Sequence, residues 1–223
     1  IKVSGKPDIE HIVRLTRHGP VLPEGYKNIS KYLPVNHVAS LKWLALSNED
    51  TSIDALSKMA EAENVGGFID ATKSLLSPMQ SIVVGDKEGD IGFIAPARVA
   101  VRHQDNKVMG RAPVPGWLPQ YEWQGFLEFE QLPQYRNPAN GVLFSANSRF
   151  MDPTYRAHLT WDWAENYRQQ RIKKLIANSN APHDMASMMA GHRDDYSPAL
   201  IEFRDESIGL LQAGVSVNRN IIS

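Results

Sequence analysis

Residues 80–95 place the strongest constraint on the fold, because they predict a β-hairpin. Two runs rich in β-favouring residues flank a charged turn that contains Gly89. The acids of this turn superficially resemble a calcium loop, but the EF-hand pattern requires Gly at its sixth position and Glu at its twelfth. Counted from Asp86, those positions hold Ile91 and Ala97. We therefore interpret the segment as a turn between two antiparallel strands.

Helical spacing appears on both sides of this hairpin. Ile53, Leu56 and Ala60 lie at i, i+3 and i+7, on one face of a helix that begins at Ser52. Similar patterns predict further helices over residues 68–76, 163–177, 183–191 and 198–211. Antiparallel strands together with separate helices predict an α+β fold.

The chain before Ser52 is less regular. Residues 7–16 alternate imperfectly between apolar and polar, which predicts a half-buried strand. The apolar segment 38–46 fits a strand or a helix. His18 could act as a base, but no carboxylate lies at a useful spacing, so we expect a packed or capping role.

Residues 109–138 are rich in Pro, Gly and aromatic side chains and show little periodicity, which predicts a long ordered loop. Aromatic side chains can stack on bases, but this stretch has few basic residues. The formal net charge is -1 and the sequence pI is about 6.7. Nucleic acid is therefore not an expected partner.

The size of the chain, 223 residues and 25.0 kDa, allows one or at most two domains. Cysteine is absent, which excludes disulfides and thiol catalysis. The longest apolar runs are far below the ~20 residues of a membrane span, so we expect no membrane partner.

Residues 141–149 combine a predicted buried strand with a polar end. Val142, Leu143 and Phe144 favour β-structure, and Asn147 follows among other polar residues. Asn147 can end the strand through an Asx-type turn. Alternatively, its side-chain amide can donate a hydrogen bond to a developing oxyanion without adding charge.

Five blocks, in order, resemble the penicillin acylase (penicillin amidase) family. They are Thr-Arg-His-Gly-Pro-Val at 16–21, Gly-Asp-Ile-Gly-Phe at 89–93, the Pro-, Trp- and Gly-rich stretch at 113–126, Gly-Val-Leu-Phe-Ser-Ala-Asn at 141–147 and Tyr-Arg-x-x-Arg-Ile at 167–172. The resemblance implies an N-terminal nucleophile (Ntn) hydrolase with a layered αββα core. Such enzymes split amides with a Ser that self-cleavage exposes at the start of the β subunit.

The resemblance also implies that the chain is an internal piece of that β subunit, because no Ser here matches the nucleophile. We expect the remaining α and β segments as partners and no activity from these residues alone. Residues 214–223 are interpreted as a ragged tail. The expected organisation is one partial domain over 1–223, with sheet and helices in 1–105, a wrapping loop in 106–140, and a strand and C-terminal helices in 141–223.

The resemblance assigns catalytic roles to Asn147 and Arg168. Asn147 matches the oxyanion donor. Arg168 matches an arginine near the nucleophile, where a permanent charge can orient substrate or tune the terminal amine by repulsion. Without the resemblance, Arg168 would be interpreted as a solvent-facing helix residue, and Arg171 has the same ambiguity.

Substrate and metal contacts are implied for five further residues. Leu44 matches a pocket-lining position, although an ordinary core leucine fits equally, and Gln80 and Ser81 border the expected pocket. A structural calcium in the intact protein would be held by the carbonyl of Gly110 and by Asp152.

The functional hypothesis is hydrolysis of N-acyl amides, with penicillin, cephalosporin or acyl-homoserine lactone substrates, in an exported or periplasmic protein. The alternative is a non-catalytic scaffold or binding fragment with the same fold.

Overall fold

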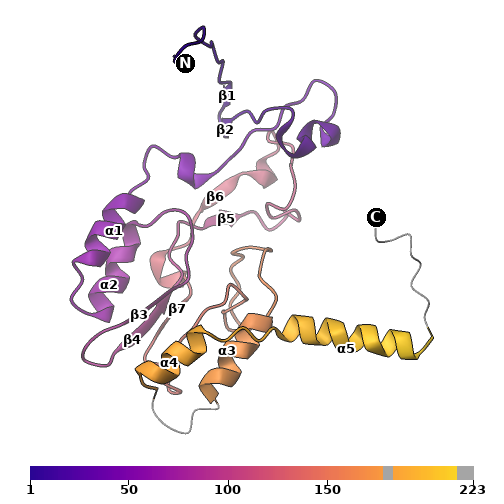
Figure 1. The fold of residues 1–223 in the computed structure, drawn as a ribbon. Helices are drawn as coiled ribbons and strands as arrows, with labels where there is room; N and C mark the ends of the chain where they lie inside the picture. The colour runs from indigo at the N-terminus through magenta and orange to yellow at the C-terminus, as the bar shows by residue number, and fades with distance from the viewer. Residues whose placement is uncertain (178–182, 215–223) are drawn as a thin grey trace. The chain divides into compact units, whose positions relative to one another are not determined.

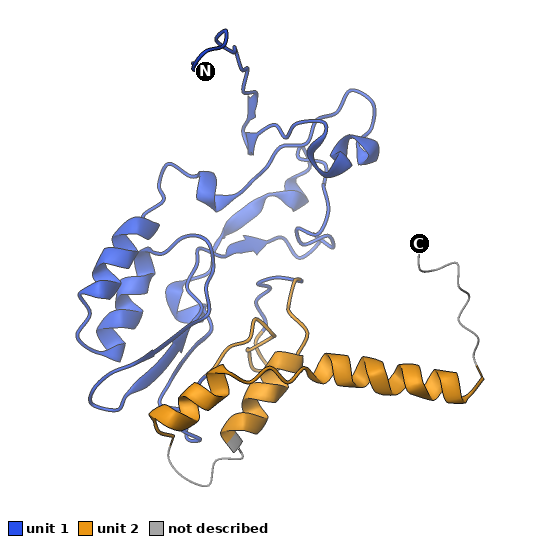
Figure 2. Ribbon diagram, in the orientation of Figure 1, with its two compact units in different colours: residues 1–143, 156–161 blue, residues 144–155, 162–223 orange. Residues whose placement is uncertain are grey.

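The structure, a computed structural model, describes residues 1–177 and 183–214 (Figure 1). The chain divides into two compact units (Figure 2). Unit 1 comprises residues 1–143 and 156–161, and unit 2 comprises residues 144–155 and 162–223. Of the tail predicted at 214–223, all but the first residue lies outside the described residues.

The predicted hairpin is confirmed in unit 1. Strands β3 (Ile82–Gly85) and β4 (Ile91–Ile94) pair antiparallel, and β7 (Gln134–Arg136) pairs antiparallel with the other side of β4. The turn closes because Asp86 N–H donates to the Asp90 carbonyl at 3.0 Å. One carboxylate oxygen of Asp86 also accepts from the backbone N–H groups of Glu88 and Asp90. The acidic residues between β3 and β4 therefore belong to a turn, as the sequence predicted.

Helices α1 (Ser52–Ala60) and α2 (Val65–Ala71) lie side by side, and α2 packs on β4 (Figure 1). The start of α1 at Ser52 agrees with the prediction. Helix α2 begins three residues before the predicted start, because the Asn64 side chain caps it by accepting from Gly67 N–H. It ends in the 3₁₀ turn η3 (Thr72–Ser74).

The core of unit 1 forms where α2 meets the sheet. The clustered buried side chains are Val65, Ile69, Ile94, Val99 and Leu132. Gly92 makes the close approach possible, because a Cβ there would lie 2.7 Å from a methyl carbon of Val65.

The prediction of one long loop over 109–138 was wrong. That segment contains η4 (Pro119–Tyr121), β6 (Trp123–Phe126), η5 (Phe129–Gln131) and β7. Strand β6 pairs with β5 (Ala100–Arg102) in a two-stranded sheet. These strands are only three or four residues long, and their partners lie far away in the sequence. These strands are therefore determined by their pairing with distant segments and not by a local sequence pattern.

The N-terminal strand prediction was mostly wrong. Only β1 (Leu15–Thr16) and β2 (Gly19–Pro20) pair, and residues 7–14 are exposed and form no strand. Further on, η1 (Tyr26–Tyr32) and η2 (Leu44–Leu46) are 3₁₀ helices. The segment 38–46, for which strand and helix were both open, contains η2 and a single bridge between Ser40 and Val21.

Unit 2 is helical. Helix α3 (Tyr167–Ala177) begins four residues later than predicted, whereas α4 (Met185–His192) and α5 (Pro198–Gln212) follow the predicted spans closely. Asp184 and Ser197 cap the last two helices, and Pro198 opens α5. Among the described residues, no helix combines the length and the apolar character of a membrane span.

The predicted strand at 142–144 is absent, because no described segment forms a ladder with it. Val142, Leu143 and Phe144 are half-buried and not fully buried. This stretch therefore reaches Asn147 without strand pairing.

Candidate functional site

Asn147 occupies a tight turn in unit 2. Its φ of 62° lies in the left-handed region, which asparagine tolerates better than most residues. Its neighbours Ala146 and Ser148 are each only 4% exposed, whereas Asn147 itself is exposed. The turn therefore buries both flanking residues and presents the Asn147 side chain at the surface of unit 2.

Arg168 lies at the start of helix α3 and stabilises the turn that contains Asn147. Its Nη2 donates to the Ala146 carbonyl at 2.8 Å and to Oδ1 of Asn147 at 2.7 Å. The backbone N–H of Ala164 donates to the Asn147 carbonyl at 2.9 Å. The structure thus brings the two predicted catalytic residues together, with Arg168 exposed on α3 and hydrogen-bonded to the turn.

The contact fixes the orientation of the Asn147 amide. A guanidinium carries only donors, so the group facing Arg168 has to be the amide oxygen. The Nδ2 group then points away from Arg168. None of the described residues accepts a hydrogen bond from Nδ2 of Asn147. Its N–H donors are therefore available to an acceptor from outside these residues, such as an oxyanion.

Two further contacts keep α3 in place beside the turn. The buried Ser148 hydroxyl donates to Oε1 of Gln169 at 2.6 Å. One turn further, Arg171 makes a two-point ion pair with Asp194, with Nε 2.9 Å from Oδ2, and its guanidinium stacks over the Tyr196 ring at 4.4 Å. The sequence left the role of Arg171 open. In the structure, its side chain joins α3 to the segment before α5.

The residues predicted to line the substrate pocket lie in unit 1. Leu44 is half-buried at the start of η2, and Gln80 and Ser81 lie just before β3. No hydrogen bond within the described residues joins Leu44 to Gln80 or Ser81. Their roles as substrate contacts stay predictions.

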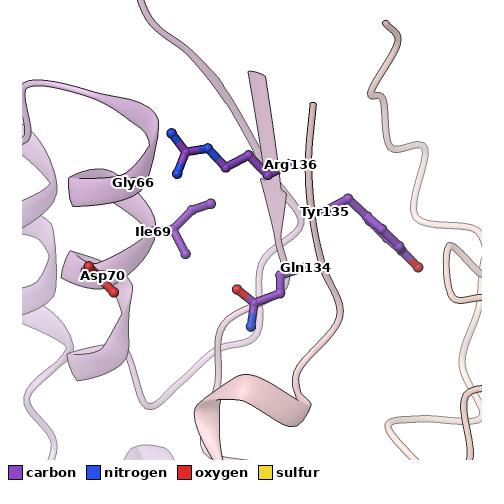
Figure 3. Close-up of a pocket in the computed structure, with 6 residues that line it drawn as sticks. All are labelled: Gly66, Ile69, Asp70, Gln134, Tyr135 and Arg136. Carbon is purple, nitrogen blue, oxygen red and sulfur yellow. The ribbon is translucent and has the colours of Figure 1, made fainter. Parts of the chain in front are cut away.

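Unit 1 has a pocket of about 350 Å³ beside α2 and β7 (Figure 3). Its lining residues are Gly66, Ile69, Asp70, Gln134, Tyr135 and Arg136, none of which was predicted. The charged groups already have partners, because Arg136 pairs with Asp90 at 2.6 Å and Asp70 pairs with Lys73 at 2.9 Å. These ion pairs leave the pocket without an uncompensated charge to bind a ligand.

His18 has a carboxylate partner that the sequence analysis missed. Its Nε2 lies 2.7 Å from Oε1 of Glu122, which is 104 residues away in the chain. Lys42 and Arg17 also pair with Glu122, each at 2.8 Å. The Lys42 ammonium and His18 lower the pKa of Glu122 to about 2. No spacing rule reveals such a pair, because the fold alone brings the two segments together.

The calcium ligands predicted from the resemblance have unfavourable surroundings. The Arg102 guanidinium is so close to Gly110 that a Cβ there would be 3.0 Å from Nη2. In unit 2, Oδ1 of Asp152 accepts from Thr154 N–H at 2.8 Å and from the Thr154 hydroxyl. Calcium takes six to eight oxygen ligands, and a neighbouring cation opposes it.

Within residues 1–177 and 183–214, no three His, Asp or Glu side chains gather closely enough to hold a metal ion. Gly110 and Asp152 as ligands stay predictions.

Comparison with known proteins identifies the family. The model of the penicillin amidase family matches residues 1–219. Because this match covers nearly the whole chain, the chain belongs to the penicillin amidase family, as the sequence blocks predicted.

Curated relatives agree with this assignment. Penicillin acylase 2 proenzyme from Pseudomonas sp. (strain SE83) is 32% identical over 214 residues, which cover 94% of this chain and 26% of that protein. Acyl-homoserine lactone acylase QuiP from Pseudomonas aeruginosa is 30% identical over 199 residues, covering 87% of this chain and 23% of that protein. The chain thus spans about a quarter of the length of these relatives.

The fold also matches a solved structure. Thermostable penicillin G acylase from Alcaligenes faecalis superposes with a TM-score of 0.61 at 26% identity, covering 78% of this chain and 30% of that one. The predicted α+β class, as part of an Ntn-hydrolase core, is therefore confirmed.

Proposed function

We infer that this chain forms part of an N-acyl amide hydrolase and supplies its oxyanion donor. The observation that carries the proposal is the Asn147 amide, whose oxygen is held by Arg168 at 2.7 Å and whose Nδ2 donors have no acceptor among the described residues. A preorganised neutral donor of this kind stabilises negative charge as it develops on a carbonyl oxygen.

The nucleophile in this proposal is an N-terminal Ser supplied by another segment of the protein. Its hydroxyl attacks the amide carbonyl carbon, and its own α-amine, with an ordinary pKa near 8, takes the proton. The resulting oxyanion accepts from Nδ2 of Asn147 and from a backbone N–H elsewhere. Collapse expels the amine, which takes the proton, and leaves an acyl-enzyme that water hydrolyses.

Arg168 is assigned a positioning role. Its contacts with Ala146 and Asn147 use the guanidinium to fix the turn and the amide. The sequence left two roles open for Arg168, which were substrate orientation and tuning of the terminal amine. These contacts require neither role. A cation behind the amide also polarises it, which strengthens Nδ2 as a donor.

The substrate class follows from the names of the relatives, which are a penicillin acylase and acyl-homoserine lactone acylases. Both names describe removal of an acyl group, and amides of both kinds suit an uncharged oxyanion donor. We assign the remaining segments of the protein as partners and a periplasmic or exported location, both by resemblance to the family.

The test is hydrolysis of a panel of N-acyl substrates by the full-length protein. The panel contains penicillins, cephalosporins and acyl-homoserine lactones. Asn147→Ala should lower kcat by about 10²–10³, the usual cost of losing one oxyanion donor. Asn36→Ala is a matched control, because Asn36 is an exposed asparagine with the same φ of 62°.

Activity of the wild type on at least one substrate, lost in the Asn147 variant alone, supports the proposal. A wild-type protein that is inert on the whole panel would favour the scaffold alternative. Equal losses in both variants would show that Asn147 matters only through the stability of a turn.

A further inference from the structure

Two arginines and a histidine of unit 1 gather around the turn at residues 109–110. We call Arg102, Arg111 and His158 the basic cluster. Arg102 lies at the end of β5, and its guanidinium is against Gly110. The imidazole of His158 lies near the backbone of Met109, the neighbouring residue of the same turn. These contacts bring side chains from three separate segments to one place.

Arg102 is the unusual member, because it is half-buried and has no partner in the part of the chain that the structure describes. None of the described residues forms a hydrogen bond or an ion pair with it. Burial lowers the pKa of the Arg102 guanidinium. Partly withdrawing a guanidinium from water without a partner is unfavourable, so an anion bound beside Arg102 would stabilise this arrangement.

The contrast with another arginine of unit 1 is informative. Arg98, whose side chain is 33% exposed, lies 3.5 Å from Glu49 and stacks over the Phe126 ring at 5.1 Å. Half-buried arginines in this fold can therefore have carboxylate partners. Arg102 differs because no described carboxylate pairs with it.

Arg111 and His158 both lie against the ring of Trp161. The Arg111 guanidinium lies 4.5 Å over the ring of Trp161, and that ring is 4.9 Å from the imidazole of His158. Burial, and then the charges of Arg102 and Arg111, lower the pKa of His158. The charges of both guanidinium groups thus disfavour protonation of the His158 imidazole.

The acid nearest in sequence does not neutralise the cluster. Asp105 is exposed and pairs with His103 at 3.5 Å. The turn at residues 109–110 brings its backbone close to the Arg102 guanidinium. Met109 and Gly110 have positive φ angles of 52° and 89° there. A side chain at position 110 would press on Arg102.

The geometry points to a binding site for one small oxyanion, a carboxylate or a phosphate, held by the Arg102 guanidinium and flanked by Arg111 and His158. A guanidinium fork matches the two oxygens of such a group. The anion is either free in solution or a carboxylate side chain from another segment of the protein. The inference is independent of the proposed hydrolase activity.

The experiment is isothermal titration calorimetry of the 223-residue chain with inorganic phosphate and, separately, with acetate. Arg102→Gln should weaken binding by about tenfold or more, because it removes the charged fork. Arg98→Gln is the control and should leave the affinity within about twofold, since Arg98 lies outside the cluster. Arg111→Gln, at an exposed position, is a second variant for which we expect a smaller loss, and circular dichroism checks that each variant folds.

A second arm repeats the titration on the full-length protein. Phosphate or acetate binding that depends on Arg102 in both proteins identifies a free anion. Binding by the chain alone, with Arg102→Gln lowering the Tm of the full-length protein more than Arg98→Gln, identifies a protein carboxylate as the occupant.

Three results would overturn the inference. The first is no binding of either anion by the chain at concentrations on the order of 10 mM. The second is equal weakening by Arg102→Gln and Arg98→Gln, which would indicate general charge attraction. The third is binding by the chain that the full-length protein lacks, without a larger Tm effect at Arg102.

Discussion

Nη2 of Arg168 lies 2.7 Å from Oδ1 of Asn147 and donates to the Ala146 carbonyl as well. One guanidinium nitrogen thus holds both the backbone and the side chain of the turn. Because a guanidinium cannot accept a hydrogen bond, the contact also decides which end of the Asn147 amide faces outward.

Arg168→Gln in the full-length protein should lower kcat on N-acyl substrates by about 10–10², because a misplaced donor loses much of its effect. Arg168→Lys should lose less, since an ammonium still donates to an oxygen but without the planar fork. Steady-state kinetics measures both. Unchanged kcat in Arg168→Gln would show that the Asn147 amide is held without it.

Gly92 allows α2 to approach β4, and Gly92→Ala should destabilise the chain by about 1–3 kcal/mol through overpacking. The added Cβ would lie 2.7 Å from Val65 and 3.2 Å from Ile69. Gly67→Ala is the contrast, because its Cβ would meet nothing closer than 3.7 Å and alanine favours a helix. Urea unfolding should show a loss for the first variant and a small gain for the second; the same sign for both would refute the packing argument.

The Asp86 carboxylate accepts backbone hydrogen bonds from Glu88 and Asp90 within the hairpin turn and from Val65 at the start of α2. Asp86→Ala should therefore lower the free energy of unfolding by about 1–3 kcal/mol. Glu88→Ala, which removes an exposed carboxylate from the same turn, should stay within about 0.5 kcal/mol of the wild type. Similar effects from both substitutions would mean that the contacts of Asp86 contribute little.

Glu122 makes stability depend on acid pH. Hydrogen bonds from Lys42 and His18 lower its folded pKa from 4.5 to about 2. A depressed pKa gives stability that is fully present above the unfolded pKa and is lost as the pH falls through the folded pKa. The wild type should therefore lose stability between about pH 5 and pH 2, by about 1 kcal/mol after allowing for solvent screening.

Glu122→Gln removes this titration, so its free energy of unfolding should fall less over the same pH interval. Urea unfolding at several pH values compares the two proteins. Parallel curves would show that the ion pairs around Glu122 do not perturb its carboxyl group in solution.

Elements with strong local signals could be predicted from the sequence. The hairpin at β3 and β4 has a charged turn between two β-rich runs, and α5 has a serine cap followed by Pro198. Strands β6 and β7 could not be found in this way. Their pairing with β5 and β4 joins residues such as Ala100 to Phe126 and Gly92 to Arg136, and nothing in their local sequence encodes those distant contacts.

The candidate site shows the same division. The resemblance indicated Asn147 and Arg168, and the structure adds the hydrogen bond that makes one orient the other. The apolar residues before Asn147 wrongly suggested a paired strand, because β-propensity does not supply a partner. Glu122 was missed as the partner of His18 because side chains 104 residues apart leave no pattern in the sequence.

The most direct test of the central claim is a double-mutant cycle on kcat of the full-length protein, with Asn147→Ala, Arg168→Gln and both together. If Arg168 acts by orienting the Asn147 amide, it has nothing to orient once that amide is gone. The double variant should then be no more than about threefold slower than Asn147→Ala alone. Fully multiplicative losses would contradict the account, because they would show that the two residues act independently.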